Sequence, residues 1–180
     1  AAALTPNGFV AWGVVYIRRY TEYSLMDASI ILGVVTLIAG FVGVTVGSHI
    51  ADHWYSKTKA GRSLLVACAV ILSIPFFFLG FAATGSSGLF IFAFGMGILL
   101  ISSYFGPVAA VVQDVVPGHL RATAFAVYIF VIHLFGGATA PAVVGKLSDI
   151  YDLKTALAIA TSGQLVAGIV FFVISFMIIR

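Results

Sequence analysis

Five stretches of this 180-residue chain contain no charged side chain, and they constrain its fold more than any other feature. They cover residues 1–17, 28–51, 63–113, 122–145 and 155–179. Only 8% of the residues are charged and 62% are hydrophobic, whereas a soluble domain carries about 25% charged residues. A helix of about 20 apolar residues is long enough to cross the hydrocarbon core of a bilayer. We therefore expect an integral membrane protein.

The longest charge-free stretch is divided by the turn-forming residues of segment 84–88, which reads Thr-Gly-Ser-Ser-Gly. The pattern then predicts six helices, at residues 4–17, 28–51, 62–83, 88–113, 120–146 and 154–179. Runs such as residues 30–35 lack the alternation of apolar and polar side chains that is typical of membrane β-barrels. The predicted fold class is therefore all-α transmembrane, a six-helix bundle.

Composition also argues against several kinds of function. The net charge of +3 is spread thinly between the apolar stretches, so no basic stripe is present that would bind nucleic acid. The sequence contains no His, Cys and Asp grouping with metal-ligand spacing, and no set of nucleophile, base and acid on one face. We therefore expect no metal, no cofactor and no enzymatic activity.

The end of the second predicted helix carries a family resemblance. Residues 47–53 read Gly-Ser-His-Ile-Ala-Asp-His, in which small residues allow close helix packing and an acid follows them. This segment resembles the Gly-x-Leu-Ala-Asp-Arg signature of the major facilitator superfamily, found after the second helix and, in weaker form, after the eighth. Ser48 takes the Gly position, Asp52 the Asp position and His53 the Arg position.

Two further matches lie at the ends of the fifth predicted helix. Residues 116–124, with Arg121, are similar to the Pro-x-x-x-Arg-x-x-Ala entry into the family's eleventh helix, and residues 145–149, with Gly145 and Asp149, show the Gly-x-Leu-Ser-Asp form. Together the matches imply the C-terminal six-helix half of a twelve-helix fold. The resemblance implies that Ser48, Asp52, Arg121, Gly145 and Asp149 form its conformational signature.

Within this superfamily, the fifth helix resembles the Spinster-like lipid transporters. These often show His-Leu-Leu-Gly-Asp, then Ser-Pro, then Gly and Ser-Asp, and residues 133–149 follow that order. Gly137 stands where the pattern has Asp, and Ala140 where it has Ser. An acid that could serve ion coupling or substrate binding is therefore absent from this position.

Several residues are candidates for a substrate cavity. His133 falls in the middle of a helix, where an ionisable residue usually faces the bundle interior or a water-filled cavity. Trp12, Tyr16 and Tyr104 could form an aromatic wall, and Gly137 lies close to His133 in the sequence. The alternatives are that His133 only bonds to a neighbouring helix and that the aromatic residues anchor helix ends at the membrane surface. Residues 102–107, which end in Gly-Pro, predict a kink.

The resemblance implies a secondary active transporter that works by alternating access and is coupled to protons. The expected substrate is an amphipathic lipid such as a sphingolipid or lysolipid, and small organic anions, sugars or drugs are alternatives. An alternative of another class is a non-transporting membrane scaffold subunit. The expected partners are membrane lipids, the small-molecule substrate and an N-terminal six-helix bundle absent from this chain, and the expected location is the bacterial inner membrane.

Overall fold

Helices dominate the structure because a chain in lipid must satisfy its backbone hydrogen bonds internally. The computed structural model describes residues 4–83 and 87–179, and contains no strand within these ranges. The helices in chain order are α1 (Leu4–Tyr20), α2 (Leu25–Lys57), α3 (Gly61–Ala82), α4 (Ser87–Ser102), α5 (Phe105–Asp114), η1 (Gly118–Leu120), α6 (Arg121–Ile132), η2 (His133–Gly137), α7 (Thr139–Ile150), α8 (Leu153–Ser162) and α9 (Gln164–Ile179).

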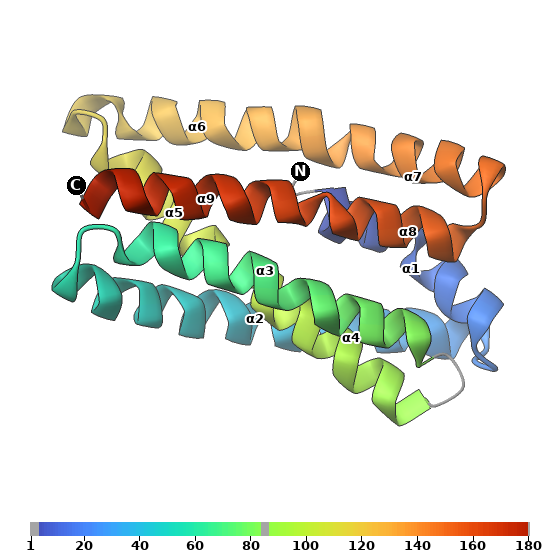
Figure 1. Ribbon diagram of the computed structural model, residues 1–180. Helices are drawn as coiled ribbons and strands as arrows, with labels where there is room; N and C mark the ends of the chain where they lie inside the picture. Colours follow the sequence, from blue (N-terminus) through green and yellow to red (C-terminus); the bar gives the residue numbers. More distant parts are fainter. Residues whose placement is uncertain (1–3, 84–86, 180) are drawn as a thin grey trace.

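In the described part of the chain these helices form six rods that run along a common axis (Figure 1). Three rods are composite: α4 continues into α5, η1 and α6 continue through η2 into α7, and α8 continues into α9. Five rods are long and apolar enough to cross a membrane, and α1, with 17 residues, is the shortest. The predicted fold class is therefore confirmed as a six-helix bundle, half of the superfamily's twelve.

The first two helices are longer than the sequence predicted. The predicted range 4–17 extends to Tyr20, and 28–51 becomes Leu25–Lys57, because the prediction stopped each helix at its first charged residue. Some of these charges suit helix ends: Asp27 lies in the first turn of α2 and Lys57 in its last, where they complement the helix dipole. The Ser24 hydroxyl caps α2 by accepting from the Asp27 backbone N–H.

The last three predicted helices are interrupted, whereas the third, 62–83, differs by one residue at each end. The predicted 88–113 breaks between α4 and α5, and Pro107 explains the break because its ring excludes the carbonyl four residues earlier. The predicted 120–146 starts with η1, contains η2 and extends to Ile150, and 154–179 is divided at Gly163. The expected kink at residues 102–107 is thus present.

The core is rich in aromatic side chains contributed by α1, α3 and α4. Phe9 and Phe94 lie with ring centroids 3.8 Å apart, and Tyr16 has no exposed area. Polar side chains also link two helices inside the bundle, since Ser73 on α3 donates to Gln164 Oε1 on α9 at 2.8 Å. Such interhelical hydrogen bonds stabilise membrane bundles modestly.

Small residues bring α2 into backbone contact with α4 and α5. A Cβ added at Gly43 would overlap the backbone of Leu99, and one added at Gly47 would lie 2.5 Å from the Ser103 Cβ. A Cβ at Gly106 would overlap the hydroxyl of Ser48 in the same way. Glycine is therefore required at this crossing for the helices to approach as closely as they do.

Candidate functional site

Polar side chains gather in two regions of the bundle. The first, called the charged cluster, consists of Asp52, Arg62 and Asp114 and lies where α2 and α5 end and α3 begins. The second, called the polar seam, lies between the start of α1 and the π-helix η2 and consists of Asn7, His133 and Gly137.

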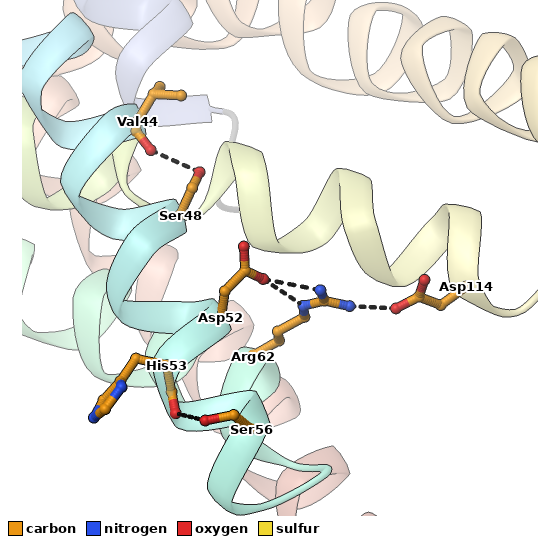
Figure 2. Close-up of polar contacts among 7 residues, drawn as sticks. All are labelled: Val44, Ser48, Asp52, His53, Ser56, Arg62 and Asp114. Carbon is orange, nitrogen blue, oxygen red and sulfur yellow. Dashed lines mark hydrogen bonds and ion pairs between the residues drawn. The ribbon is translucent and has the colours of Figure 1, made fainter.

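Arg62 is the centre of the charged cluster. Its guanidinium bonds Asp52 Oδ1 through Nη2 at 2.8 Å and through Nε at 3.1 Å, and its Nη1 forms an ion pair with Asp114 (Figure 2). The guanidinium also lies 4.1 Å from the ring centroid of Tyr55. The Arg62 side chain is only 15% exposed, whereas those of Asp52 and Asp114 are 63% and 50% exposed. The planar fork of arginine suits this double engagement.

Helix dipoles explain why these three charges pair. Asp52 lies in the C-terminal part of α2 and Asp114 is the last residue of α5, where the dipole disfavours a negative charge. Arg62 lies at the N-terminal end of α3, where a positive charge is disfavoured. Arg62 and Asp114 are thus each at an unfavourable helix end, and their ion pair compensates both, while Asp52, five residues before the end of α2, adds a second partner for Arg62.

Arg62 supplies the cation that pairs with the signature acid. His53, matched to the signature Arg, points its imidazole away from Asp52, and the guanidinium on Asp52 comes from Arg62 (Figure 2). Asp114 was missed altogether. The sequence contained a sign of it, because an acid three residues before a helix-ending Pro117 lies near a helix C-terminus, where a negative charge is disfavoured and a nearby cation is favoured.

The other signature residues are dispersed. Ser48 lies one turn before Asp52 and donates to the Val44 carbonyl at 2.7 Å. Arg121 donates from Nε to the Gln113 carbonyl at 3.1 Å, at the same end of the bundle.

Gly145 and Asp149 lie on α7, towards the opposite end. Gly145 packs against Trp12, since a Cβ there would lie 3.2 Å from Trp12 Cζ2, and Asp149 is exposed. The five predicted signature residues thus occupy both ends of the bundle.

The polar seam is built on an irregular helix segment. In η2 the Ala138 N–H donates to the His133 carbonyl five residues earlier, at 2.8 Å, which is the π pattern often found at functional sites. A Cβ at Gly137 would lie 3.6 Å from His133 Cδ2 and 3.8 Å from Asn7 Oδ1. A longer side chain at position 137 would therefore reach both residues.

His133 itself is exposed within this chain. Its Nδ1 lies 3.0 Å from the Ile129 carbonyl; because a carbonyl only accepts, Nδ1 carries the hydrogen in this contact and Nε2 is left as the second proton site. The neighbouring Trp12 Nε1 donates to the Pro141 carbonyl at 3.0 Å. That bond fixes α1 against α7 immediately beyond η2.

The predicted cavity residues do not share one cavity. His133 and Gly137 meet in the polar seam and Trp12 lies beside it, but Tyr104 lines a different pocket, of about 410 Å³, between α5, α6, η2 and α9. Tyr16 lies inside the aromatic core and has no exposed area. Within this chain Tyr16 is enclosed by neighbouring aromatic rings and lines none of the pockets described here.

A smaller pocket of about 230 Å³ lies between α1, α2, α4 and α5. Its wall is mainly apolar, and Asn7, Thr36 and Ser102 add polar groups. Asn7 belongs to both this pocket and the polar seam. A pocket with an apolar wall and a few polar groups suits a ligand that is mostly apolar. Among the described residues no group of His, Cys, Asp or Glu could hold a metal ion.

These features define a multi-pass integral membrane protein, a helical bundle with charges at its ends and pockets between its helices. The chain is 34% identical to Protein spinster homolog 1 of Xenopus tropicalis over 82% of its own length, and 31% identical to the Probable sphingolipid transporter spinster homolog 3 of Arabidopsis thaliana over 86%. It is 33% identical over 71% of its length to the sphingosine-1-phosphate transporter SPNS2 of Xenopus tropicalis. The chain belongs to the Spinster family of the major facilitator superfamily.

The matches cover only part of each relative. The chain spans 30% of the first two proteins and 25% of the third. No family model matches the chain.

Proposed function

We propose that this chain is the C-terminal half of a secondary active transporter that moves an amphipathic lipid across the membrane by alternating access. The observation that carries the proposal is the similarity to two relatives named as transporters of a sphingolipid and of sphingosine-1-phosphate. Both pockets agree with a lipid substrate, since their walls are mainly apolar with few polar groups. The proposed partner is an N-terminal six-helix bundle.

His133 is the proposed site of proton coupling. It is an ionisable residue in the middle of an apolar rod, and histidine changes charge near neutral pH. Gly137 lies between His133 and Asn7, and Asn7 lines the smaller pocket. Binding of a proton at Nε2 would thereby be coupled electrostatically to a polar lipid head in that pocket.

The charged cluster is the proposed conformational contact. Two carboxylates face one guanidinium, so the cluster carries one excess negative charge, and both carboxylates remain half exposed or more. That exposed charge can meet the positive N-terminus of a helix in the other bundle when the cytoplasmic side is closed. In a spectroscopic distance measurement, Asp52→Asn is expected to shift the balance away from the outward-open state. An unchanged balance would remove this role.

The transport proposal is tested with the full-length protein in proteoliposomes under an imposed pH gradient. We expect gradient-driven movement of a lysolipid and not of a sugar acid, with a loss of coupling in His133→Ala. Gly137→Asp places a carboxylate between His133 and Asn7. That variant is expected to change the pH dependence of transport.

Other outcomes would overturn the proposal. Movement of the sugar acid alone would favour a transporter of small organic anions or sugars. If neither solute moved, a non-transporting scaffold subunit would be favoured. The expected location is the bacterial inner membrane, which subcellular fractionation of the source cells would test.

A further inference from the structure

Hydroxyl groups inside the helical rods differ in whether they have a hydrogen-bond partner. Serine and threonine in a helix commonly donate to a backbone carbonyl three or four residues earlier, as Thr45 on α2 does at 2.8 Å and Ser103, next to the end of α4, does at 3.0 Å. Thr36 on α2 and Ser102 on α4 make no side-chain hydrogen bond within the described residues. These two hydroxyls are therefore left with unused donor and acceptor sites.

Both hydroxyls belong to residues that line the smaller pocket, of about 230 Å³, between α1, α2, α4 and α5. In the described part of the chain, the buried side-chain polar atoms that lack a partner belong to Tyr16, Tyr128 and Gln164. Thr36 and Ser102 are not among them, so their oxygens retain accessible surface, although Ser102 as a whole is only 7% exposed. A molecule in the pocket can therefore reach both oxygens.

The divergence of α2 from α4 sets the spacing of the two hydroxyls. A Cβ added at Gly43 would overlap the backbone of α4, whereas one added at Gly40 would lie 3.9 Å from Ser102 Oγ. One added at Gly33 would meet no atom within 4 Å. Thr36 lies one turn from Gly40, about 5.4 Å along the helix axis, so the hydroxyls of Thr36 and Ser102 lie about one turn apart. Two polar groups on neighbouring carbons of a ligand can each reach one of them at hydrogen-bond distance.

Among the described residues, no charged side chain lines this pocket, and the rest of its wall is apolar except for Asn7. An ion buried without a partner costs far more free energy than a neutral group whose hydrogen bonds are satisfied. Hydroxyl groups therefore suit the pocket, whereas an ammonium or phosphate group has to remain outside it.

We infer that Thr36 and Ser102 determine the specificity of the smaller pocket by selecting a lipid whose polar region carries two neighbouring uncharged hydrogen-bonding groups, such as two hydroxyls. Each protein hydroxyl bonds one group of the lipid. A site built to bond a hydroxyl discriminates against an analogue that lacks it, because the polar groups of the site are then left unpaired. The inference rests on the proposed function for the selected lipid being the transported molecule.

The test uses three lipids that share one oleoyl chain. Monooleoylglycerol carries two neighbouring hydroxyls, propyl oleate carries none, and oleoylcholine carries a permanent positive charge. Their affinities for the full-length protein in detergent are measured by competition with radiolabelled monooleoylglycerol in a scintillation proximity assay. We expect propyl oleate to bind about tenfold to a hundredfold more weakly than monooleoylglycerol, as for the loss of two hydrogen bonds, and oleoylcholine to bind more weakly still. Equal affinity of monooleoylglycerol and either competitor would overturn the inference.

Variants of the two residues remove the hydroxyls with little change in volume. Thr36→Val and Ser102→Ala are each expected to lower the affinity for monooleoylglycerol by about threefold to tenfold, as for the loss of one hydrogen bond, and to leave the affinity for propyl oleate unchanged. Thr36→Ser keeps the hydroxyl and is expected to keep the preference for monooleoylglycerol. Loss of affinity for both lipids in equal proportion would overturn the inference, because it would show a change of shape and not of hydrogen bonding.

The chain offers a matched control for each variant. Thr45→Val on α2 and Ser103→Ala beside Ser102 also remove hydroxyls, but these hydroxyls already have carbonyl partners and their residues do not line the pocket. We expect both controls to leave both affinities unchanged. Equal effects of the test and control variants would overturn the inference.

Transport separates this inference from the proposed function. A binding preference that depends on Thr36 and Ser102, found together with no lysolipid transport, would leave the inference standing and reject the proposed function. Gradient-driven lysolipid transport without any preference between monooleoylglycerol and propyl oleate would keep the proposed function and overturn the inference.

Discussion

Arg62 is the residue on which the charged cluster depends. Two carboxylates face its guanidinium, one of them at the C-terminus of α5, and no other cation bonds them among the described residues. Arg62→Gln is expected to lower stability by about 1–2 kcal/mol, more than the usual 0–1 kcal/mol of an exposed pair, because Arg62 serves both acids and is mostly buried. Thermal unfolding in detergent measures the loss.

A double-mutant cycle with Asp114→Asn supplies the control for that prediction. If the two residues interact directly, the double variant will lose less stability than the sum of the losses of the two single variants. Additive losses would show that the ion pair contributes nothing to stability.

Asp152 makes stability depend on pH at the opposite end of the bundle. Its carboxylate caps α8 by accepting from Thr155, and accepts from the Tyr20 hydroxyl at 3.3 Å. Hydrogen bonds from the Thr155 side chain and backbone, and then from Tyr20, lower the pKa of Asp152 below its ordinary value. The ionised Asp152 carboxylate therefore stabilises the fold fully when the pH is above the ordinary aspartate pKa of the unfolded chain. This stabilisation is lost as the pH falls through the lowered pKa of Asp152 in the folded protein.

Asp152→Asn is the matched variant, because asparagine also caps a helix but does not titrate over this range. We expect the melting temperature of the wild type to fall more than that of Asp152→Asn as the pH is lowered through the acidic range. Parallel melting curves at every pH would contradict the assignment.

At the scale of helices, the close crossing of α2 with α4 and α5 depends on glycine residues, which have no side chain. Gly47→Ala would place a methyl group 2.5 Å from the Ser103 Cβ and 2.6 Å from its Cα, so backbone must shift. We expect a loss of about 1–3 kcal/mol, as for overpacking in other cores. Gly33→Ala on the same helix meets no atom within 4 Å and is expected to be neutral or stabilising. Equal melting temperatures for both variants would contradict this packing.

The π-helix adds one residue to a single turn between α6 and α7. Because a π turn holds about one residue more than an α turn, deleting one residue within 133–137 is expected to restore α-helical bonding and to leave α7 in nearly the same orientation. The bond from Trp12 Nε1 to the Pro141 carbonyl is then expected to persist. Tryptophan emission in a Trp54→Phe background, which leaves Trp12 as the single tryptophan, should therefore keep its wavelength. A shift to longer wavelength would show that the deletion rotates α7 and exposes the indole.

The sequence was sufficient for the number, order and type of the helices, because the stretches without charge directly reflect the membrane. It also predicted an irregularity within residues 102–107, and the helix breaks there at residues 103–104, since Pro107 excludes the carbonyl four residues earlier. It could not predict η2, because a π insertion depends on how α6 and α7 pack. Nor could it pair Arg62 with Asp114, which are 52 residues apart and meet only after the rods assemble.

At the scale of the whole molecule, the rods differ in how much this chain covers them. The most apolar window of α3 is 50% buried, whereas that of α2 and that of the rod 118–150 are 17% buried each. The central rod is thus α3, and the exposed faces of α2 and of 118–150 are left for lipid or another bundle. Alternating access requires such faces to change their surroundings.

Thiol labelling can detect that change. In a Cys68→Ser background, Thr36→Cys, which lines the smaller pocket, is expected to react with a water-soluble maleimide at a rate that changes when lysolipid is added. Val173→Cys, exposed on α9, is expected to remain slow throughout because lipid surrounds it. A constant rate at position 36 would argue against alternating access.

The glycine crossing has a mechanical consequence. The backbones of these helices are in close contact at Gly43, Gly47 and Gly106, so sliding one helix along another would require neighbouring side chains to move. We therefore expect α2, α4 and α5 to move as one rigid unit. Asp52 and Asp114 lie towards the same end of this rigid unit, and Arg62 bonds both. A force applied at this end is therefore expected to displace the wall of the smaller pocket formed by Thr36 and Ser102, with little bending between the helices.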